Sequence, residues 1–261
     1  MKPEEKVRKF YEGSGWESDQ EGATLDARLW EDLRPVARDY IAGCRNKLLR
    51  HLPARGDLIL DAASGPIQYP EYMEYSRAFN KRVCVDISCK ALEQAKKKLA
   101  DRGEVFCASI LALPFPDDHF DAVLSVHTIY HIDQAQQEKA VRELLRVAKP
   151  KAPVVVVYSN PDRLFARLKR GFTGKRRSDS EPGAPLYFFA HPSSWWRRFE
   201  DAAQIEVEPW RSLTAAESRR FIPDNSLGKL CFKALASFER IMPKTATAFG
   251  AYPTIVLRKR G

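Results

Sequence analysis

Short apolar runs alternate with amphipathic stretches along most of this chain. The runs are rich in β-branched and aromatic side chains, as expected of buried strands. They fall at residues 58–60, 82–85, 104–108, 120–125, 153–158, 205–210 and 251–259. Because helical patterns separate most of these runs by short connections, the chain is predicted to have an α/β fold with a doubly wound, mostly parallel, seven-stranded sheet.

The segments between and around these runs carry apolar residues at helical spacing. Helices are predicted at residues 2–11, 29–48, 72–79, 89–99, 133–148, 164–170, 193–203 and 227–241. Ser88 is a candidate N-cap, because its hydroxyl can accept a hydrogen bond from a backbone N–H of the first helical turn. Residues 171–185 are polar and contain Gly and Pro, so a loop is predicted there.

Length and charge narrow the class of protein. With 261 residues, the chain is predicted to form one large domain. Its net charge of +9 is compatible with an anionic substrate, a membrane surface or nucleic acid as a partner. No apolar run reaches membrane-spanning length, and the charged N-terminus lacks the apolar core of a signal peptide. A cytoplasmic location is therefore expected.

The cysteines predict neither a metal site nor a disulfide framework. There are five, an odd number, and their spacing matches neither pattern. Cys84 and Cys107 lie in strand-like runs and are predicted to be buried thiols, which fits a reducing compartment.

Two apolar runs end in an acidic residue, and this pattern indicates a ligand-binding site. Asp61 ends the first run and opens a small-residue turn around Gly65, and Asp86 ends the second run. In an open α/β sheet, a tight turn after the first strand brings backbone close to a ligand, and a carboxylate after the second strand binds ribose hydroxyls. A nucleoside cofactor is therefore predicted. The Gly-x-Gly-x-x-Gly spacing of nicotinamide dehydrogenases does not occur around Gly65, which makes such an enzyme a weaker alternative.

Four segments carry a family resemblance when taken in order. They are Leu-Ile-Leu-Asp-Ala-Ala-Ser-Gly (58–65), Val-Asp-Ile-Ser (85–88), Leu-Pro-Phe-Pro-Asp-Asp-His-Phe-Asp-Ala-Val (113–123) and Glu-Leu-Leu-Arg-Val-Ala-Lys-Pro (143–150). Together they resemble class I S-adenosylmethionine-dependent methyltransferases of the ubiquinone-biosynthesis-like kind, the type 11 methyltransferase domain. The resemblance implies a Rossmann-like methyltransferase fold, S-adenosylmethionine (SAM) as the cofactor, and methyl transfer as the activity.

The resemblance also implies how the chain is divided. A single methyltransferase domain would span 1–261. It would comprise a lid helix and turn (1–28), a cofactor-binding core (29–160), a basic insertion (161–192), and a C-terminal helix with closing strands (193–261). The last part contains an insertion at 211–250 that is expected to supply an acceptor lid or a dimer contact, in a monomer or a homodimer.

By the same resemblance, a defined set of residues is expected to contact the cofactor. The set is Asp61, Ala63, Ser64, Gly65, Asp86, Ile87, Ser109, Ile110, Ser125 and, from the lid, Tyr11 and Trp16. Asp86 would accept hydrogen bonds from the ribose. Ile87 would pack on the adenine, and Ser109 and Ile110 would flank the other side of the ring. The family usually has glycines at the positions of Ala63, Gly65 and Ile67. Ile67 is therefore expected to narrow the space beside the methionine end or to push that backbone outward.

The acceptor side follows from the chemistry of methyl transfer. The reaction is an in-line displacement, so the protein must align the nucleophile and, for a hydroxyl, remove its proton. His127 and His131 follow the fourth strand and are the candidates for this base. Residues predicted to bind the acceptor are Tyr69, Tyr130 and His191. The favoured acceptor is a small molecule methylated on a hydroxyl oxygen, such as a natural product or another specialised metabolite.

Other functions stay open. Residues 163–177 contain seven basic residues and no acid, with Phe165 and Phe172 among them. This run is typical of a solvated surface, but it also suits an RNA or lipid-like acceptor or peripheral membrane contact. Val-His-Thr-Ile-Tyr (126–130) stands where amino-group methyltransferases of nucleic-acid bases carry Asn/Asp-Pro-Pro-Tyr, so nucleic acid is not favoured. A non-catalytic cofactor-binding module is the remaining alternative.

Overall fold

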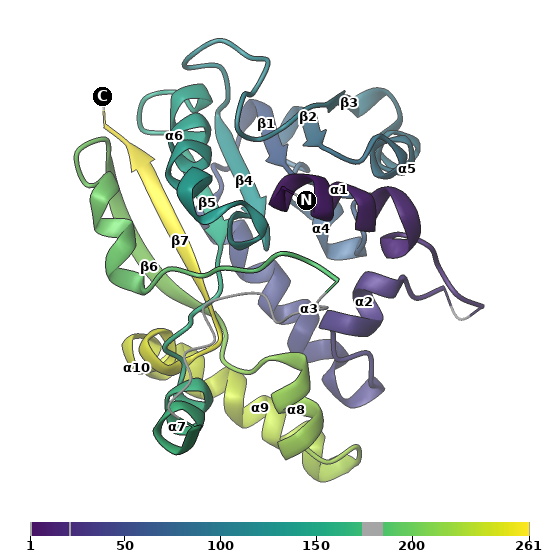
Figure 1. The fold of residues 1–261 in the computed structure, drawn as a ribbon, viewed down its shortest axis with the longest axis vertical. Helices are drawn as coiled ribbons and strands as arrows, with labels where there is room; N and C mark the ends of the chain where they lie inside the picture. Colours follow the sequence, from purple (N-terminus) through teal and green to yellow (C-terminus); the bar gives the residue numbers. More distant parts are fainter. Residues whose placement is uncertain (1, 21, 174–184, 261) are drawn as a thin grey trace.

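A computed structural model describes residues 2–20, 22–173 and 185–260. One seven-stranded sheet runs through it in the order β3-β2-β1-β4-β5-β7-β6 (Figure 1). The strands are β1 (Gly56–Ala62), β2 (Phe79–Asp86), β3 (Gly103–Cys107), β4 (Ala122–Val126), β5 (Pro153–Val157), β6 (Ala203–Arg211) and β7 (Tyr252–Lys259). Only β7 runs antiparallel to its neighbours, β5 and β6. The predicted doubly wound, mostly parallel sheet is confirmed.

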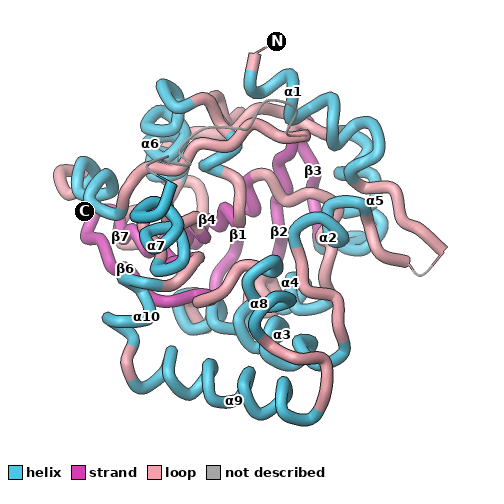
Figure 2. The backbone as a smooth tube through the Cα atoms, turned by 60° about the horizontal axis from the view of Figure 1, so that its bottom comes forward, coloured by secondary structure: helices cyan, strands magenta, loops and turns pink. Residues whose placement is uncertain are grey.

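Helices lie on both faces of this sheet (Figures 1 and 2). They are α1 (Pro3–Phe10), α2 (Leu25–Trp30), α3 (Arg38–Asn46), α4 (Pro70–Glu74), α5 (Cys89–Leu99), α6 (Gln137–Val147), α7 (Leu164–Thr173), α8 (Ala215–Phe221), α9 (Ser226–Ile241) and α10 (Pro243–Phe249). Successive side chains of a strand point to opposite faces. Leu60 therefore packs in the core under α6, whereas its neighbour Ile59 packs in the core under α3 and α9.

The strand register brings four loops to one edge of the sheet. The parallel strands β1, β2, β3 and β4 are neighbours, so the segments that follow them begin at the same edge. Ligands of open α/β sheets bind at this carboxyl edge. The helix that follows β2 begins as predicted, because the Ser88 hydroxyl accepts a hydrogen bond from the backbone N–H of Ala91 at 3.2 Å.

The single helix predicted over 29–48 is wrong. The chain forms α2, leaves helical geometry at Glu31, and resumes with a short 3₁₀ turn at Pro35–Ala37 before α3. The cause is Pro35, which has no N–H to donate and forces Arg34 before it into an extended conformation. The helix predicted at 193–203 is a 3₁₀ segment, Ser193–Phe199, in which Trp195 and Trp196 are buried.

The predicted loop at 171–185 begins later than expected, because α7 continues to Thr173. Residues 174–184 lie outside the described residues, and with them the last part of the basic run 163–177.

Candidate functional site

A cavity of about 770 Å³ lies at the carboxyl edge of the sheet, within the usual size of a small-molecule site. Most of the residues that the sequence singled out line it. They are Tyr11, Trp16, Ala63, Ser64, Gly65, Tyr69, Asp86, Ile87, Ser109, Ile110, His127, Tyr130 and His131. Residues from the N-terminus and from the loops after β1, β2, β3 and β4 thus meet around one space.

Three predicted site residues lie outside the cavity wall. Asp61 belongs to β1, and its carboxylate binds the buried guanidinium of Arg82 on the neighbouring strand. The Ser125 hydroxyl is buried in β4 and has no hydrogen-bond partner within the described residues. The His191 ring stacks on Trp195, with ring centroids 4.5 Å apart. Packing, rather than exposure to the cavity, accounts for the placement of each.

The turn after β1 has an unusual backbone. Ala63, Gly65 and Ile67 all have positive φ, at 60°, 54° and 51°. These are the positions where the family usually has glycine, the residue that adopts this conformation at no steric cost. The Ile67 side chain is buried against Cys84 and Leu92, away from the cavity wall. The expectation that Ile67 narrows the cavity is therefore wrong, because the turn directs its side chain into the core.

Asp86 holds the ends of two loops together. Its Oδ2 accepts a hydrogen bond from the Gly65 backbone N–H, and its Oδ1 accepts one from the Ser88 backbone N–H, both at 2.8 Å. Burial raises the pKa of this carboxyl to about 6. A carboxylate offers about four lone-pair positions, so two remain for other donors. Asp86 is thus fixed in place with acceptor capacity to spare.

Ile87 and Ile110 follow β2 and β3 and supply apolar surface to the cavity beside Asp86. Ser109 lies between the β3 end and Ile110, and its hydroxyl accepts a hydrogen bond from the Leu111 backbone N–H at 3.2 Å. Apolar surface with a few polar groups beside it is typical of small-molecule and cofactor sites.

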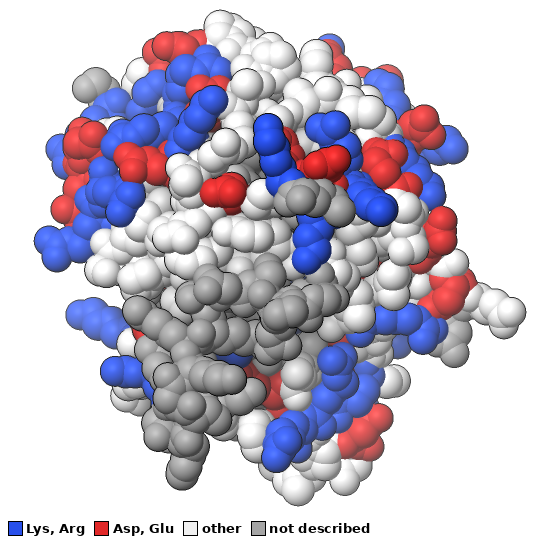
Figure 3. Space-filling view, viewed as in Figure 1, with Lys and Arg blue, Asp and Glu red and all other residues white. Residues whose placement is uncertain are grey.

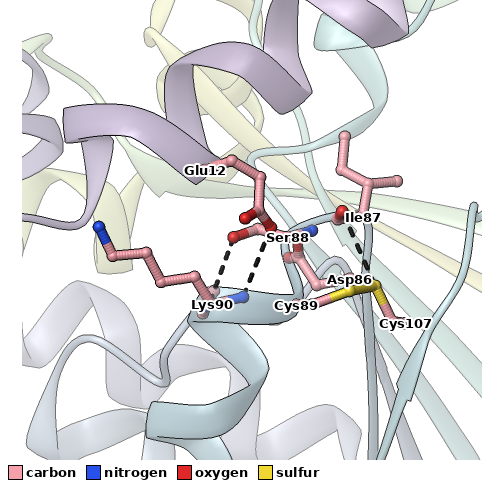
Figure 4. The surroundings of a disulfide bond; sticks show 8 residues. Glu12, Asp86, Ile87, Ser88, Cys89, Lys90 and Cys107 are labelled. Atoms are coloured by element: carbon pink, nitrogen blue, oxygen red, sulfur yellow. Dashed lines mark hydrogen bonds between the residues drawn. A yellow bond between two sulfur atoms is a disulfide. The ribbon is translucent and has the colours of Figure 1, made fainter.

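A disulfide joins the same two loops, contrary to the prediction of free cysteines. Cys89 begins α5 and Cys107 ends β3, and their Cα atoms are 5.4 Å apart (Figure 4). The parallel register places Cys107 opposite Asp86, close to the start of α5. Both cysteines are exposed, so Cys107 is not a buried thiol, whereas Cys84 is one as predicted. A separation of 18 residues in the sequence gave no signal of this pairing.

The N-terminal segment covers the glycine turn. The Tyr11 and Trp16 rings stack with centroids 4.6 Å apart, and the indole lies on Gly65, where an added Cβ would be 2.8 Å from its Cζ2 atom. The Tyr11 hydroxyl donates a hydrogen bond to Asp26 Oδ1 at 3.0 Å. Burial raises the pKa of Asp26 to about 6. The segment after α1 also contacts α5, so residues expected to form a lid lie over the cavity.

The two histidines differ in their hydrogen bonds. The Nδ1 atom of His131 lies 2.6 Å from the backbone carbonyl oxygen of Tyr187. A carbonyl only accepts, so Nδ1 carries the hydrogen and Nε2 has the free lone pair. Burial lowers the pKa of His131 to about 4. His127 Nδ1 instead lies 2.8 Å from the hydroxyl of Tyr130, and burial lowers its pKa well below the usual range. Both histidines are therefore neutral at physiological pH.

A buried ionic network that the sequence did not reveal borders the other side of the cavity. Arg211, at the end of β6, binds Glu31, which also pairs with Arg45 at 2.9 Å. The Arg45 guanidinium lies 3.3 Å from the centroid of the Tyr69 ring, which helps to fix this predicted acceptor residue. Tyr252, from β7, adds another ring to the wall. These residues come from distant segments without a shared motif, so only the folded chain brings them together.

Comparisons with known proteins agree with the fold. Residues 60–156 match a family model described as a methyltransferase domain. The ubiquinone/menaquinone biosynthesis C-methyltransferase UbiE of Serratia proteamaculans is 31% identical over 127 residues, 45% of this chain and 48% of that protein. The chain thus spans about half the length of curated relatives such as this one.

Solved structures share the fold over nearly the whole chain. The N-methyltransferase NodS from Bradyrhizobium japonicum WM9, in complex with S-adenosyl-l-homocysteine, is 11% identical, has a TM-score of 0.58, and covers 98% of both chains. A DhpI–SAM–HEP complex is 14% identical, has a TM-score of 0.61, and covers 97% of this chain and 96% of that one. At such identities the likeness shows the fold alone.

Proposed function

We propose that this chain, a class I SAM-dependent methyltransferase by its domain and its fold, methylates a hydroxyl oxygen of a small molecule such as a natural product. One observation carries the proposal. The cavity that Asp86 and Gly65 line is also lined by two neutral histidines and by a wall of aromatic rings. A nucleoside-type site and a proton acceptor thus border the same space.

The residues present fit SAM. Asp86 has acceptor capacity left for two ribose hydroxyls, and Ile87 and Ile110 provide an apolar slot for the adenine. The Trp16 Nε1 atom is buried and has no hydrogen-bond partner within the described residues, which leaves a donor in the lid beside Gly65. When bound, SAM supplies the electrophilic methyl group, so the protein's task is to position the acceptor and remove its proton.

His131 is the better candidate for the base. Because Nδ1 is committed to the Tyr187 carbonyl, Nε2 is the atom that can take a proton from an acceptor hydroxyl. The fixed tautomer needs no rearrangement before proton transfer. His127 shares its Nδ1 with the Tyr130 hydroxyl and packs edge to face against both the Trp210 and the Tyr252 rings, which suits it to positioning the acceptor.

The aromatic wall indicates a flat, largely apolar acceptor. Residues that provide it are Trp30, Tyr69, Tyr72, Tyr130, Phe188 and Tyr252. A ring carbon is the second candidate for the nucleophile, because similar proteins are named ubiquinone/menaquinone biosynthesis C-methyltransferases. Carbon and oxygen methylation give different products from one phenolic substrate, which mass spectrometry and NMR distinguish.

The test begins with binding. Calorimetry with SAM, and with NADH as a control, should show micromolar binding of SAM alone; absence of SAM binding would refute the proposal. Labelled SAM and a panel of phenols then identify the acceptor. The variant His131→Asn should lower kcat by about 10²–10⁴-fold with the SAM affinity unchanged. His119→Asn, at a half-buried histidine outside the cavity wall, is the matched control.

A further inference from the structure

Helix α9 has one anchored side. Its Phe232 ring stacks on Tyr40, with centroids 5.1 Å apart. Glu239 is buried, accepts a hydrogen bond from the Tyr40 hydroxyl at 2.6 Å, and pairs with the Lys47 ammonium at 2.5 Å. These contacts fix the rotation of α9 on α3, and they therefore also determine which residues face outward.

The outer side of α9 is apolar. Leu227, Leu230, Ala234, Phe238 and Ile241 recur at spacings of three and four residues, so they form one stripe along the helix. Leu230 and Ile241 are 62% and 72% exposed. In Figure 2, α9 runs along the lower edge of the molecule, and no element of the described chain lies beyond it. A continuous apolar stripe of this kind marks an interaction surface.

The exposed charges around this stripe are almost all positive. In α8, α9, α10 and their connections (215–250), the exposed charged residues are Arg219, Arg220, Lys229, Lys233, Arg240 and Lys244 against a single acid, Asp224. Lys229, Lys233 and Arg240 each directly precede a residue of the stripe and therefore flank it. Figure 3 shows basic side chains gathered over α8 and α9.

We infer that the outer face of α9 docks on the surface of an anionic lipid bilayer. A fixed amphipathic helix with leucine, phenylalanine and isoleucine on one strip and lysine and arginine beside it has the chemistry of an interfacial helix. A second copy of the chain fits less well, because the same cationic residues would face one another. RNA would pair with the lysines but leave the apolar stripe in water. None of the helices described is both long and apolar enough to span the bilayer, so the contact is peripheral.

Docking would place the cavity close to the lipid. Helix α8 lines the cavity through Ala215, Ala216 and Glu217 and leads within a few residues into α9. Leu29 and Trp30, which are exposed, also belong to the cavity wall. An apolar acceptor dissolved in the membrane would then reach the cavity by a short path. The docking itself does not depend on methyl transfer.

Co-sedimentation of the full chain with vesicles tests the inference. Vesicles of phosphatidylcholine with phosphatidylglycerol should bind the protein, and vesicles of phosphatidylcholine alone should bind it at least tenfold less. Binding to the anionic vesicles should weaken as salt rises. The variant Leu230→Ser/Ile241→Ser should lower binding at least tenfold, whereas Leu49→Ser, at an exposed leucine of another segment, should not change it.

A charge-reversal pair completes the experiment. Lys229→Glu/Lys233→Glu should also lower binding at least tenfold, and Lys97→Glu, on the exposed side of α5, serves as its control. Thermal unfolding and SAM affinity of all variants should match the wild type, which excludes misfolding. Failure of the wild type to bind anionic vesicles would overturn the inference. So would a dimer that the serine variants dissociate, or RNA binding that only the charge variants abolish.

Discussion

Replacing Asp86 by asparagine should weaken cofactor binding without lowering the stability of the protein. The carboxyl is 7% exposed, and burial raises its pKa from 3.8 to about 6. A shift of about two pKa units corresponds to roughly 3 kcal/mol that the folded protein loses by keeping this group ionised at neutral pH. Asparagine has the same shape without the charge, so Asp86→Asn removes that cost.

The substitution also has a structural cost. Asp86 accepts hydrogen bonds from the backbone N–H groups of both Gly65 and Ser88. Asparagine has one acceptor oxygen, so one buried N–H loses its partner at roughly 1–3 kcal/mol. The free energy of unfolding at pH 7 should therefore stay the same or rise by about 2 kcal/mol at most. Urea titration without SAM measures it.

Cofactor affinity should change in the opposite direction. A hydrogen bond to a charged acceptor contributes about 1.5–3 kcal/mol, so loss of the Asp86 charge should weaken SAM binding at least about tenfold. Calorimetry measures this at pH 7.5. A variant with unaltered SAM affinity would refute the assignment of Asp86 to the ribose.

The pH dependence provides an independent check with a defined sign. Because the folded-state pKa of Asp86 is raised, its contribution to stability is present below pH 4 and is lost as the pH rises through about 6. SAM affinity should do the reverse: it should fall about tenfold per pH unit below pH 6, as the carboxyl becomes protonated. Asp86→Asn should show a flat affinity profile over that range. An equally steep profile in the variant would mean that another group titrates.

Three further substitutions test the structure around the site. Arg82→Met leaves the buried Asp61 carboxylate without its partner and should lower the free energy of unfolding by about 3–5 kcal/mol. Adding Asp61→Asn should restore most of this lost stability in urea titrations. If the double variant recovers no stability, the pairing of Arg82 with Asp61 is contradicted. Cys89→Ser/Cys107→Ser opens a loop of 18 residues and should lower the free energy of unfolding by about 3 kcal/mol; reductant should do the same to the wild type but not to the variant. Trp16→Ala removes the indole over Gly65 and should weaken SAM binding about tenfold through faster dissociation; stopped-flow measurements with an unchanged off-rate would count against a lid.

Local patterns in the sequence were enough to predict the sheet and the residues expected on the nucleoside side of the site. Strand positions follow from apolar runs, and the carboxylate after β2 follows from where such a run ends. Both signals are short-range, because a buried strand and the residue that ends it are adjacent in the chain. Asp86 and Gly65 could therefore be assigned to one site from the sequence, whereas the hydrogen bond between them is a finding of the structure.

The same reasoning failed where one residue's role depends on the backbone around it. Ile67 occupies a position that suggested a narrowed cavity, yet its positive φ turns the side chain into the core. Pro35 interrupts a segment whose apolar spacing had predicted one continuous helix. In both cases a local conformation overrides the hydrophobic pattern.

What the sequence by itself determined is therefore the succession of strands that builds the α/β sheet. The ribose role of Asp86 stays a prediction, and the cavity lies at the carboxyl edge where the site was expected. Only the tertiary structure decided which distant residues meet there: Glu31 with Arg211, Tyr11 with Asp26, and Cys89 with Cys107. The physical reason is how far apart in the chain the interacting residues lie. Strand and helix patterns arise from neighbours in the chain, whereas ion pairs and disulfides between remote segments depend on the final packing of the sheet and its helices, which no short stretch of sequence encodes.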